Sequence, residues 1–178
     1  MKKAAISVDS IKELRSQTCA SVLHCKKALE EAEGDINKAA QILRKKGLQI
    51  AVEKQSRVAK EGRIEAYVHM GNKIGVLLEV DCESDFVAKN SEFCQFTKDL
   101  AMQIAACNPA YINKEDVPAE AIENEKEKKE EFYKVNCLSE QPFVKDPGVS
   151  IKDYLGSIVG KFNENIVIRR FTRYKVGE

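Results

Sequence analysis

The chain has 178 residues, 43% of them hydrophobic, and its 29 Lys and Arg residues almost balance its 28 Asp and Glu residues. This length and composition predict one or two folded domains rather than a disordered chain. A net charge near zero argues against a protein that coats nucleic acid, so we expect no direct nucleic-acid partner. The basic start lacks a secretory apolar segment, and no apolar run approaches the roughly 20 residues of a membrane span. We therefore expect no membrane contact.

The cysteines and histidines do not form a recognisable catalytic or metal-binding pattern. The six cysteines contain no C-x-x-C pair, and only His24 and His69 could join them in a zinc site. Cys25 follows His24 on a predicted helix, where adjacent side chains diverge by about 100° and cannot form a dyad. No G-x-S-x-G, Walker or G-x-G-x-x-G motif occurs. We expect reduced, mostly buried thiols in a cytosol-like compartment, no enzyme active site, and no cofactor.

Three short helices are predicted over residues 9–47. Ser10 opens the capping box S-I-K-E, and a second helix should run from Ser21 to Glu33. Asp35 is a typical N-cap for a third helix, whose apolar residues recur at helical spacing until Gly47 ends it. These helices predict a compact bundle with a small core.

A β-hairpin is predicted after a weakly periodic, basic connector over residues 51–62. Gly71-Asn72 is a two-residue turn signal between two alternating runs. In the first run, one side of the strand carries only apolar residues, namely Ile64, Ala66, Val68 and Met70. In the second run, the apolar side carries Ile74, Val76, Leu78, Val80 and Cys82. We expect these sides to form one buried face.

The remaining segments complete an α+β fold, a small antiparallel sheet with flanking helices. A helix is predicted over 91–107, ended by Asn108-Pro109, and a charged helical stretch over 119–135. Residues 141–148 read as a loop, 150–162 as a helix and 164–174 as a last strand. The basic run of that strand is interpreted as a solvated edge balanced by nearby acids: Arg169, Arg170, Arg173 and Lys175.

The stretch DCESDFVAKN raises the question of function, because Asp81, Glu83 and Asp85 alternate and Phe86 follows at once. Alternating carboxylates could bind Ca²⁺ or Mg²⁺, but the Gly turn and distal Glu of a calcium loop are absent. A second interpretation is a strand end capped by Ser84 or Asp85, with Phe86 folded inward. A third is an exposed aromatic ring flanked by acid, suited to a pocket on a partner. Residue types alone leave these interpretations open.

Three ordered blocks cover nearly the whole chain and carry a family resemblance. They are LRSQTCASVLHCKKALEEAEGDINKAAQILRKKG, then GVLLEVDCESDFVAKNSEF, and finally CLSEQPFVKD followed by NIVIRRFTRYKVGE. Together they resemble the elongation factor Ts family, the nucleotide exchange factors of elongation factor Tu. The resemblance implies a three-helix ubiquitin-associated-like domain over 1–50, the connector over 51–62 and an α+β core over 63–178.

The resemblance also implies sites and partners. The N-terminal domain would grip the nucleotide-binding domain of GDP-bound elongation factor Tu through Arg15, Val22 and Leu23. Gln103 would make a second core contact. The segment expected near the partner's magnesium consists of Ser84, Asp85, Phe86 and Val87. Short members of this kind look like homodimers, and the expected location is a bacterial cytoplasm or an organelle.

The chain departs from the family pattern near the first contact positions. It has Thr18-Cys19-Ala20-Ser21 where Thr-Gly-Ala-Gly is usual, and Val22, Leu23 and His24 where two methionines and an aspartate usually follow. Ser84 replaces the usual Thr but keeps a hydroxyl. A rival interpretation is a helical adaptor that binds a peptide or protein through residues 9–47, and another is a metal-dependent enzyme built on the acidic triplet. The adaptor leaves the larger domain unexplained.

Overall fold

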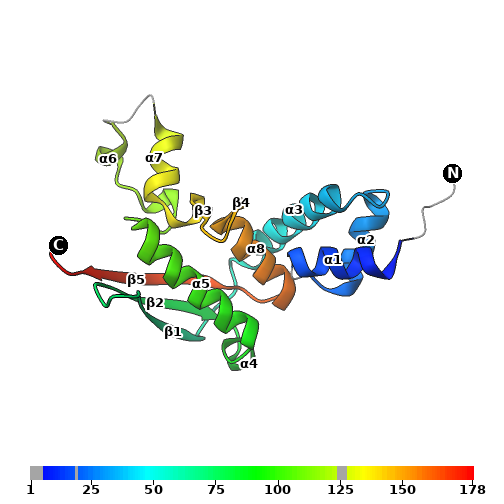
Figure 1. Cartoon of the computed structure of the whole chain (residues 1–178), viewed down its shortest axis with the longest axis horizontal. Coiled ribbons are helices and arrows are strands. Elements are labelled where there is room, and N and C mark those ends of the chain that lie inside the picture. The colour runs from blue at the N-terminus through cyan, green and yellow to red at the C-terminus, as the bar shows by residue number, and fades with distance from the viewer. Residues whose placement is uncertain (1–5, 19, 124–127) are drawn as a thin grey trace. The chain divides into compact units, whose positions relative to one another are not determined.

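The computed structural model describes residues 6–18, 20–123 and 128–178. It is mixed helix and sheet, with helices first and a small antiparallel sheet with helices after them, so the predicted α+β class is confirmed (Figure 1). Its internal contacts define two compact units. The first contains the described residues up to Arg57 together with Leu155–Asn165, and the second contains Val58–Tyr154 and Ile166–Glu178.

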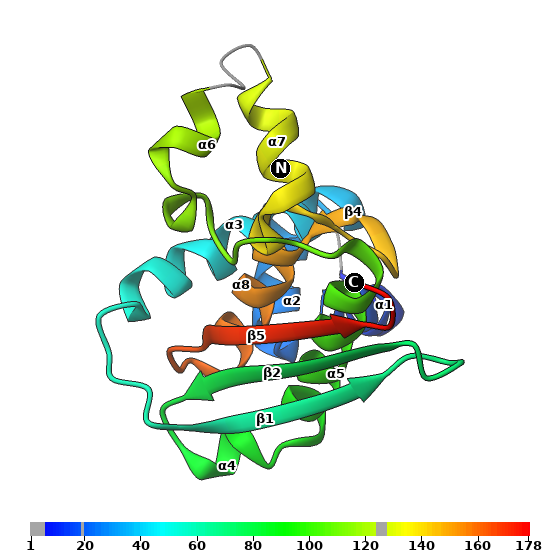
Figure 2. The same ribbon diagram turned by 90° about the vertical axis from the view of Figure 1, so that its left-hand side faces the viewer.

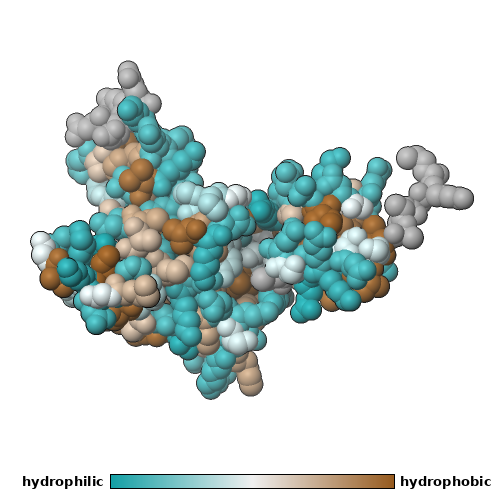
Figure 3. Space-filling model, viewed as in Figure 1, coloured by the Kyte–Doolittle hydropathy of each residue, from teal (hydrophilic) through white to brown (hydrophobic). Residues whose placement is uncertain are grey.

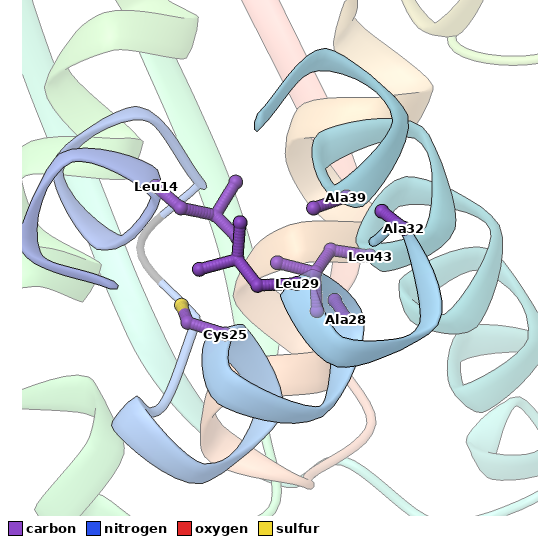
Figure 4. Close-up of a cluster of buried hydrophobic side chains, with 7 residues drawn as sticks. All are labelled: Leu14, Cys25, Ala28, Leu29, Ala32, Ala39 and Leu43. Atoms are coloured by element: carbon purple, nitrogen blue, oxygen red, sulfur yellow. The ribbon is translucent and has the colours of Figure 1, made fainter. Parts of the chain in front are cut away.

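The first unit is helical. Its helices are α1 (Val8–Thr18), α2 (Val22–Glu31), α3 (Ile36–Lys54) and the later part of α8 (Ile151–Phe162). Residues at helical spacing on α1, α2 and α3 meet in one buried cluster, drawn in Figure 4: Leu14, Cys25, Ala28, Leu29, Ala32, Ala39 and Leu43. Small alanine side chains let the short helices approach closely, and the predicted bundle core is confirmed.

The structure confirms one of two predicted helix caps and contradicts the other. The Asp35 cap is confirmed, because its carboxylate accepts a hydrogen bond from the amide of Lys38 at 3.0 Å. The Ser10 cap is wrong, because α1 already begins at Val8 and the hydroxyl of Ser7 accepts the amide of Ser10 at 3.0 Å. Ser7 offers the same capping chemistry three residues earlier, which lets the helix begin sooner.

The predicted end of the third helix at Gly47 is also wrong, since α3 continues to Lys54. Gly47 serves helix packing instead. A Cβ at this position would lie 2.7 Å from the carbonyl oxygen of Gly156 in α8, closer than a real Cβ can come. The glycine is therefore required by a contact with a segment distant in sequence, which a local reading could not detect.

The second unit contains a three-stranded antiparallel sheet in the order β1 (Glu61–Val68), β2 (Ile74–Cys82) and β5 (Val167–Lys175). One sheet face packs on α5 (Ser91–Cys107), which lies behind the strands in Figure 2. The predicted helix over 91–107 is confirmed, and Asn108 ends it in the left-handed conformation with φ of 48°. The core between helix and sheet includes Phe93, Phe96, Leu100, Ile104, Val76, Leu78 and Val80.

The faces of the first strand are opposite to those expected. The side with Ile64, Ala66 and Val68 is exposed, and Glu65 is buried against α5 at 7% exposure. Antiparallel partners share a face, and Glu65 pairs with Leu78 in the buried row. The face of β1 is thus set by its register with β2, whose predicted buried side is confirmed.

The turn of this hairpin is longer than the two residues predicted. The amide of His69 donates to the carbonyl of Ile74 at 2.9 Å, and residues 70–73 connect the strands. The amide of Asn72 donates to the carbonyl of His69 at 2.9 Å, which centres the turn on Met70 and Gly71. Gly71 and Asn72 both adopt positive φ, the property that made this dipeptide a turn signal.

Shorter elements complete the second unit. The charged stretch over 119–135 contains α6 (Ala119–Glu123) and α7 (Lys129–Asn136), with residues 124–127 outside the described part. The predicted loop over 141–148 is corrected to a small hairpin. The remaining elements are η1 (Lys114–Asp116), η2 (Leu138–Glu140), β3 (Pro142–Phe143) and β4 (Asp146–Ser150).

The predicted solvated edge is confirmed for Arg169, Arg170 and Lys175. It is wrong for Arg173, whose side chain is 10% exposed and donates through Nε to the carbonyl of Ala105 at 3.3 Å. Arg169 pairs with Asp81 at 2.7 Å, Arg170 pairs with Glu79, and Arg173 pairs with Glu178 at 3.2 Å. The described cysteines are free thiols, of which Cys25, Cys82 and Cys137 are buried, Cys94 is half-buried and Cys107 is exposed. Cys19 lies outside the described residues.

Candidate protein-docking site

The DCESDFVAKN stretch forms a single helical turn at the end of β2. This turn, α4 (Asp85–Ala88), is capped by Ser84, which has an extended backbone and accepts the amide of Val87 on its hydroxyl at 3.4 Å. The cap satisfies an amide that a helix start leaves without an intrahelical partner. The predicted capping role of this serine is confirmed.

The α4 turn directs Phe86 into solvent. Its ring is 84% exposed, whereas Val87 and Ala88 are buried at 8% and 9% exposure. Successive helical side chains diverge by about 100°, so the turn that buries Val87 projects Phe86 outward. Of the interpretations left open for this ring, the exposed one is therefore confirmed and the inward one is wrong. A large exposed aromatic side chain on a capped turn has the form of a docking anchor.

The carboxylates around Phe86 are held by separate cations. Asp85 accepts a hydrogen bond from Lys89 at 2.8 Å, and this bond and its positive charge lower the pKa of the Asp85 carboxyl. Asp81 pairs with Arg169 instead. Within the described ranges, no group of three His, Cys, Asp or Glu side chains could hold a metal ion. The acidic triplet thus provides an ionised Asp85 beside an exposed ring.

Gln103 is fully buried and holds the β3–β4 hairpin. Its amide nitrogen donates to Gln141 and to the carbonyl of Pro142, both at 3.1 Å, and its oxygen accepts the amide of Val144 at 2.8 Å. All of these contacts are internal. A partner contact at this position would have to be made by the hairpin, where Val144 is 40% exposed.

The residues predicted for the N-terminal contact lie in the first unit. Val22 and Leu23 open α2 and are 55% and 59% exposed, and Arg15 is exposed in the last turn of α1. Burial raises the pKa of the Cys25 thiol, while a bond to Thr18 and the charge of Arg15 oppose that rise.

A second exposed surface was not predicted from the sequence. The sheet face opposite α5 carries Ile64, Val68, Leu77 and Tyr174, between 52% and 70% exposed. Figure 2 shows no described element of the second unit over this face, and Figure 3 shows apolar side chains reaching the surface in both units. The sequence indicates this surface through Leu77, an apolar residue on the side of the second strand where the alternation would place a polar one. We call these four residues the open sheet face.

Helices able to span a membrane are absent from the described part of the chain.

The sequence is similar to that of known proteins over nearly its whole length. The family model described as Elongation factor TS matches residues 4–131. The chain is 50% identical to elongation factor Ts of Caldanaerobacter subterraneus subsp. tengcongensis, over 97% of this chain and 98% of the relative. It is 51% identical to elongation factor Ts of Thermodesulfovibrio yellowstonii, over 98% of each chain. These matches identify a translation elongation factor. The chain belongs to the elongation factor Ts family.

Proposed function

We propose that the chain binds GDP-bound elongation factor Tu and promotes GDP release during translation elongation. Family membership supports guanine nucleotide exchange as the activity. The observation that carries the site is the Phe86 ring, 84% exposed on a turn whose neighbouring residues are buried. A ring held in this way can enter a partner without rearrangement of its own backbone, which lowers the entropic cost of docking.

The residues of the α4 turn have different roles in this proposal. Phe86 enters between elements of the partner, and Asp85 brings a negative charge near the partner's magnesium, the largest local charge of such a site. Ser84 and Val87 hold the turn, the first by capping and the second by burial. In the first unit, Arg15, Val22 and Leu23 grip the nucleotide-binding domain.

Exchange follows from thermodynamic linkage between the two ligands of the partner. If this chain weakens nucleotide binding by a given factor, nucleotide weakens binding of this chain by the same factor. The ternary complex is then transient, and a second nucleotide displaces the exchange factor. No covalent bond is made or broken, so the chain acts as an exchange factor rather than as an enzyme in the usual sense.

We also propose that two copies associate through the open sheet face. The face combines its four apolar residues with two ion pairs, Glu79 with Arg170 and Asp81 with Arg169, and Ile64 lies opposite Glu79 on the neighbouring strand. A face of this kind suits a second copy, because a symmetric dimer places the same patch of each chain in one interface. Each dimer would then present two Phe86 turns.

The experiment is release of fluorescently labelled GDP from elongation factor Tu, followed by stopped flow with increasing amounts of this chain. We expect release to accelerate and to saturate, and excess magnesium to oppose the acceleration. Unchanged release at micromolar concentration would contradict the proposal. Binding without acceleration, abolished by substitution of Leu23, would instead favour a helical adaptor.

A further inference from the structure

The α4 turn that carries Phe86 is too short to be stable by itself. Its backbone bonds are few and include those from Ala88 to Ser84 at 3.2 Å, from Lys89 to Asp85 at 3.0 Å and from Asn90 to Val87 at 3.0 Å. A single helical turn fixes several residues for few bonds and is marginal in water. Its geometry therefore depends on contacts with the sheet and with α5.

Two cysteine side chains hold the carbonyl groups at the ends of this turn. The Cys82 thiol donates to the carbonyl of Ser84 at 3.2 Å, and the Cys94 thiol donates to the carbonyl of Ala88 at 3.7 Å. Cys82 is fully buried at the end of β2, and Cys94 lies half-buried in the first turn of α5. The turn is thus held from both sides.

Cys94 is in turn connected to an ion pair in which the Glu65 carboxylate is buried and the Arg63 side chain is 36% exposed. The guanidinium of Arg63 donates through Nη1 to the Cys94 sulfur at 3.3 Å and through Nε to Glu65 at 2.8 Å. Glu65 is 7% exposed and also accepts the hydroxyl of Thr97 at 3.1 Å. A neutral thiol can accept one hydrogen bond and donate another, so Cys94 can join Arg63 to the turn.

We propose that Arg63 and Cys94 are positioning residues for the docking of Phe86. The buried Glu65 carboxylate holds the Arg63 guanidinium, Arg63 holds the thiol, and the thiol holds the last carbonyl of the turn. The inference rests on the proposed docking role of Phe86. It assigns a role in that function to residues that do not touch the partner.

Two substitutions separate hydrogen bonding from packing at Cys94. Cys94→Ser keeps a group that donates and accepts, whereas Cys94→Ala removes both bonds. Cys107→Ala is the matched control, because Cys107 is an exposed cysteine on the same helix at its other end. Arg63→Lys keeps the charge opposite Glu65 but lacks the planar fork that reaches two partners at once.

The first measurement is hydrogen exchange of the Ala88 and Lys89 amides in the free chain. We expect Cys94→Ala to speed their exchange about fivefold, which corresponds to the roughly 1 kcal/mol of one hydrogen bond, with the sheet amides unchanged. Cys94→Ser and Cys107→Ala should resemble the wild type. Arg63→Lys combined with Cys94→Ala should add little to the single change, because both act through one contact.

The second measurement is labelled GDP release. We expect Cys94→Ala to raise the concentration for half-maximal acceleration by up to about fivefold at an unchanged plateau rate, since only the competent fraction falls. Unchanged turn amides in Cys94→Ala, or equal effects of Ser and Ala, would overturn the positioning role. If the wild type does not accelerate GDP release, the proposed exchange function is contradicted. The exchange of the Ala88 and Lys89 amides would still show whether Arg63 and Cys94 hold the turn.

Discussion

At the scale of single residues, the site depends on which side chain of a four-residue turn points outward. Phe86 and Val87 are neighbours, yet one is 84% exposed and the other 8%. Removing the first should affect binding, and removing the second should affect folding. This contrast makes the two residues a matched pair for experiment.

Phe86→Ala should lower affinity for elongation factor Tu about 30-fold or more, because a buried aromatic anchor costs about 2 kcal/mol or more on truncation. Its unfolding free energy should change by less than about 0.5 kcal/mol, as for other exposed positions. Val87→Ala, the control, should lose about 1–3 kcal/mol of stability. Titration calorimetry and urea unfolding measure the two quantities. A strongly destabilised Phe86→Ala would show that the ring belongs to the core.

Lys89→Met should raise the pKa of the Asp85 carboxyl toward its ordinary value, because the Lys89 hydrogen bond and charge are what lower it. A depressed pKa means that this contact supports the turn at neutral pH and is lost as the pH falls through the folded pKa, below the ordinary range. Carboxyl carbon shifts in an NMR pH titration measure the change. An equal Asp85 pKa in both proteins would mean that another group sets it.

At the scale of elements, periodic patterns predicted the helices well, and distant contacts decided the rest. The core positions of α2, α3 and α5 followed from helical spacing. The end of α3 could not be predicted from spacing, because Gly47 packs against Gly156, more than one hundred residues later in the chain. The buried face of β1 could not be predicted from alternation, because the register with β2 decides which side is buried.

At the candidate site, too, local chemistry predicted some features, and contacts between distant segments decided the others. The cap at Ser84 could be read from local chemistry, since a hydroxyl followed by a short helical turn is a common start. The exposure of Phe86 could not, because it depends on how the turn packs on β1 and α5. The burial of Gln103 could not be predicted either, because its partners Gln141 and Val144 lie about 40 residues later in the chain.

Gly47→Ala tests the close contact between α3 and α8. Alanine favours a helix by about 1 kcal/mol, but its Cβ would meet a backbone carbonyl at 2.7 Å, and overpacking costs about 1–3 kcal/mol. We expect a net loss of stability in urea unfolding. The control is Gly160→Ala in α8, where the nearest atom lies at 3.4 Å and the helix gain should dominate. A Gly47→Ala protein at least as stable as wild type would contradict a required close approach.

At the scale of the whole molecule, one face of the sheet packs on α5 and the other, the open sheet face, is exposed. An exposed apolar patch of contiguous strands is unusual on a monomer and marks an interaction surface. The open sheet face lies in the same unit as the α4 turn, at positions that do not include it. Association through this face would leave Phe86 available to the partner.

Leu77→Lys should convert the proposed dimer to a monomer, because it places a charge on the middle strand of the interface, where desolvation is costly. Light scattering coupled to size exclusion should give twice the chain mass of 20.0 kDa for the wild type and the chain mass for the variant. Val52→Lys is the control, since Val52 is 72% exposed on α3 in the first unit. A wild type that keeps the chain mass at high micromolar concentration would contradict the dimer. Amide exchange of the α4 turn should be the same in the wild type and in Leu77→Lys.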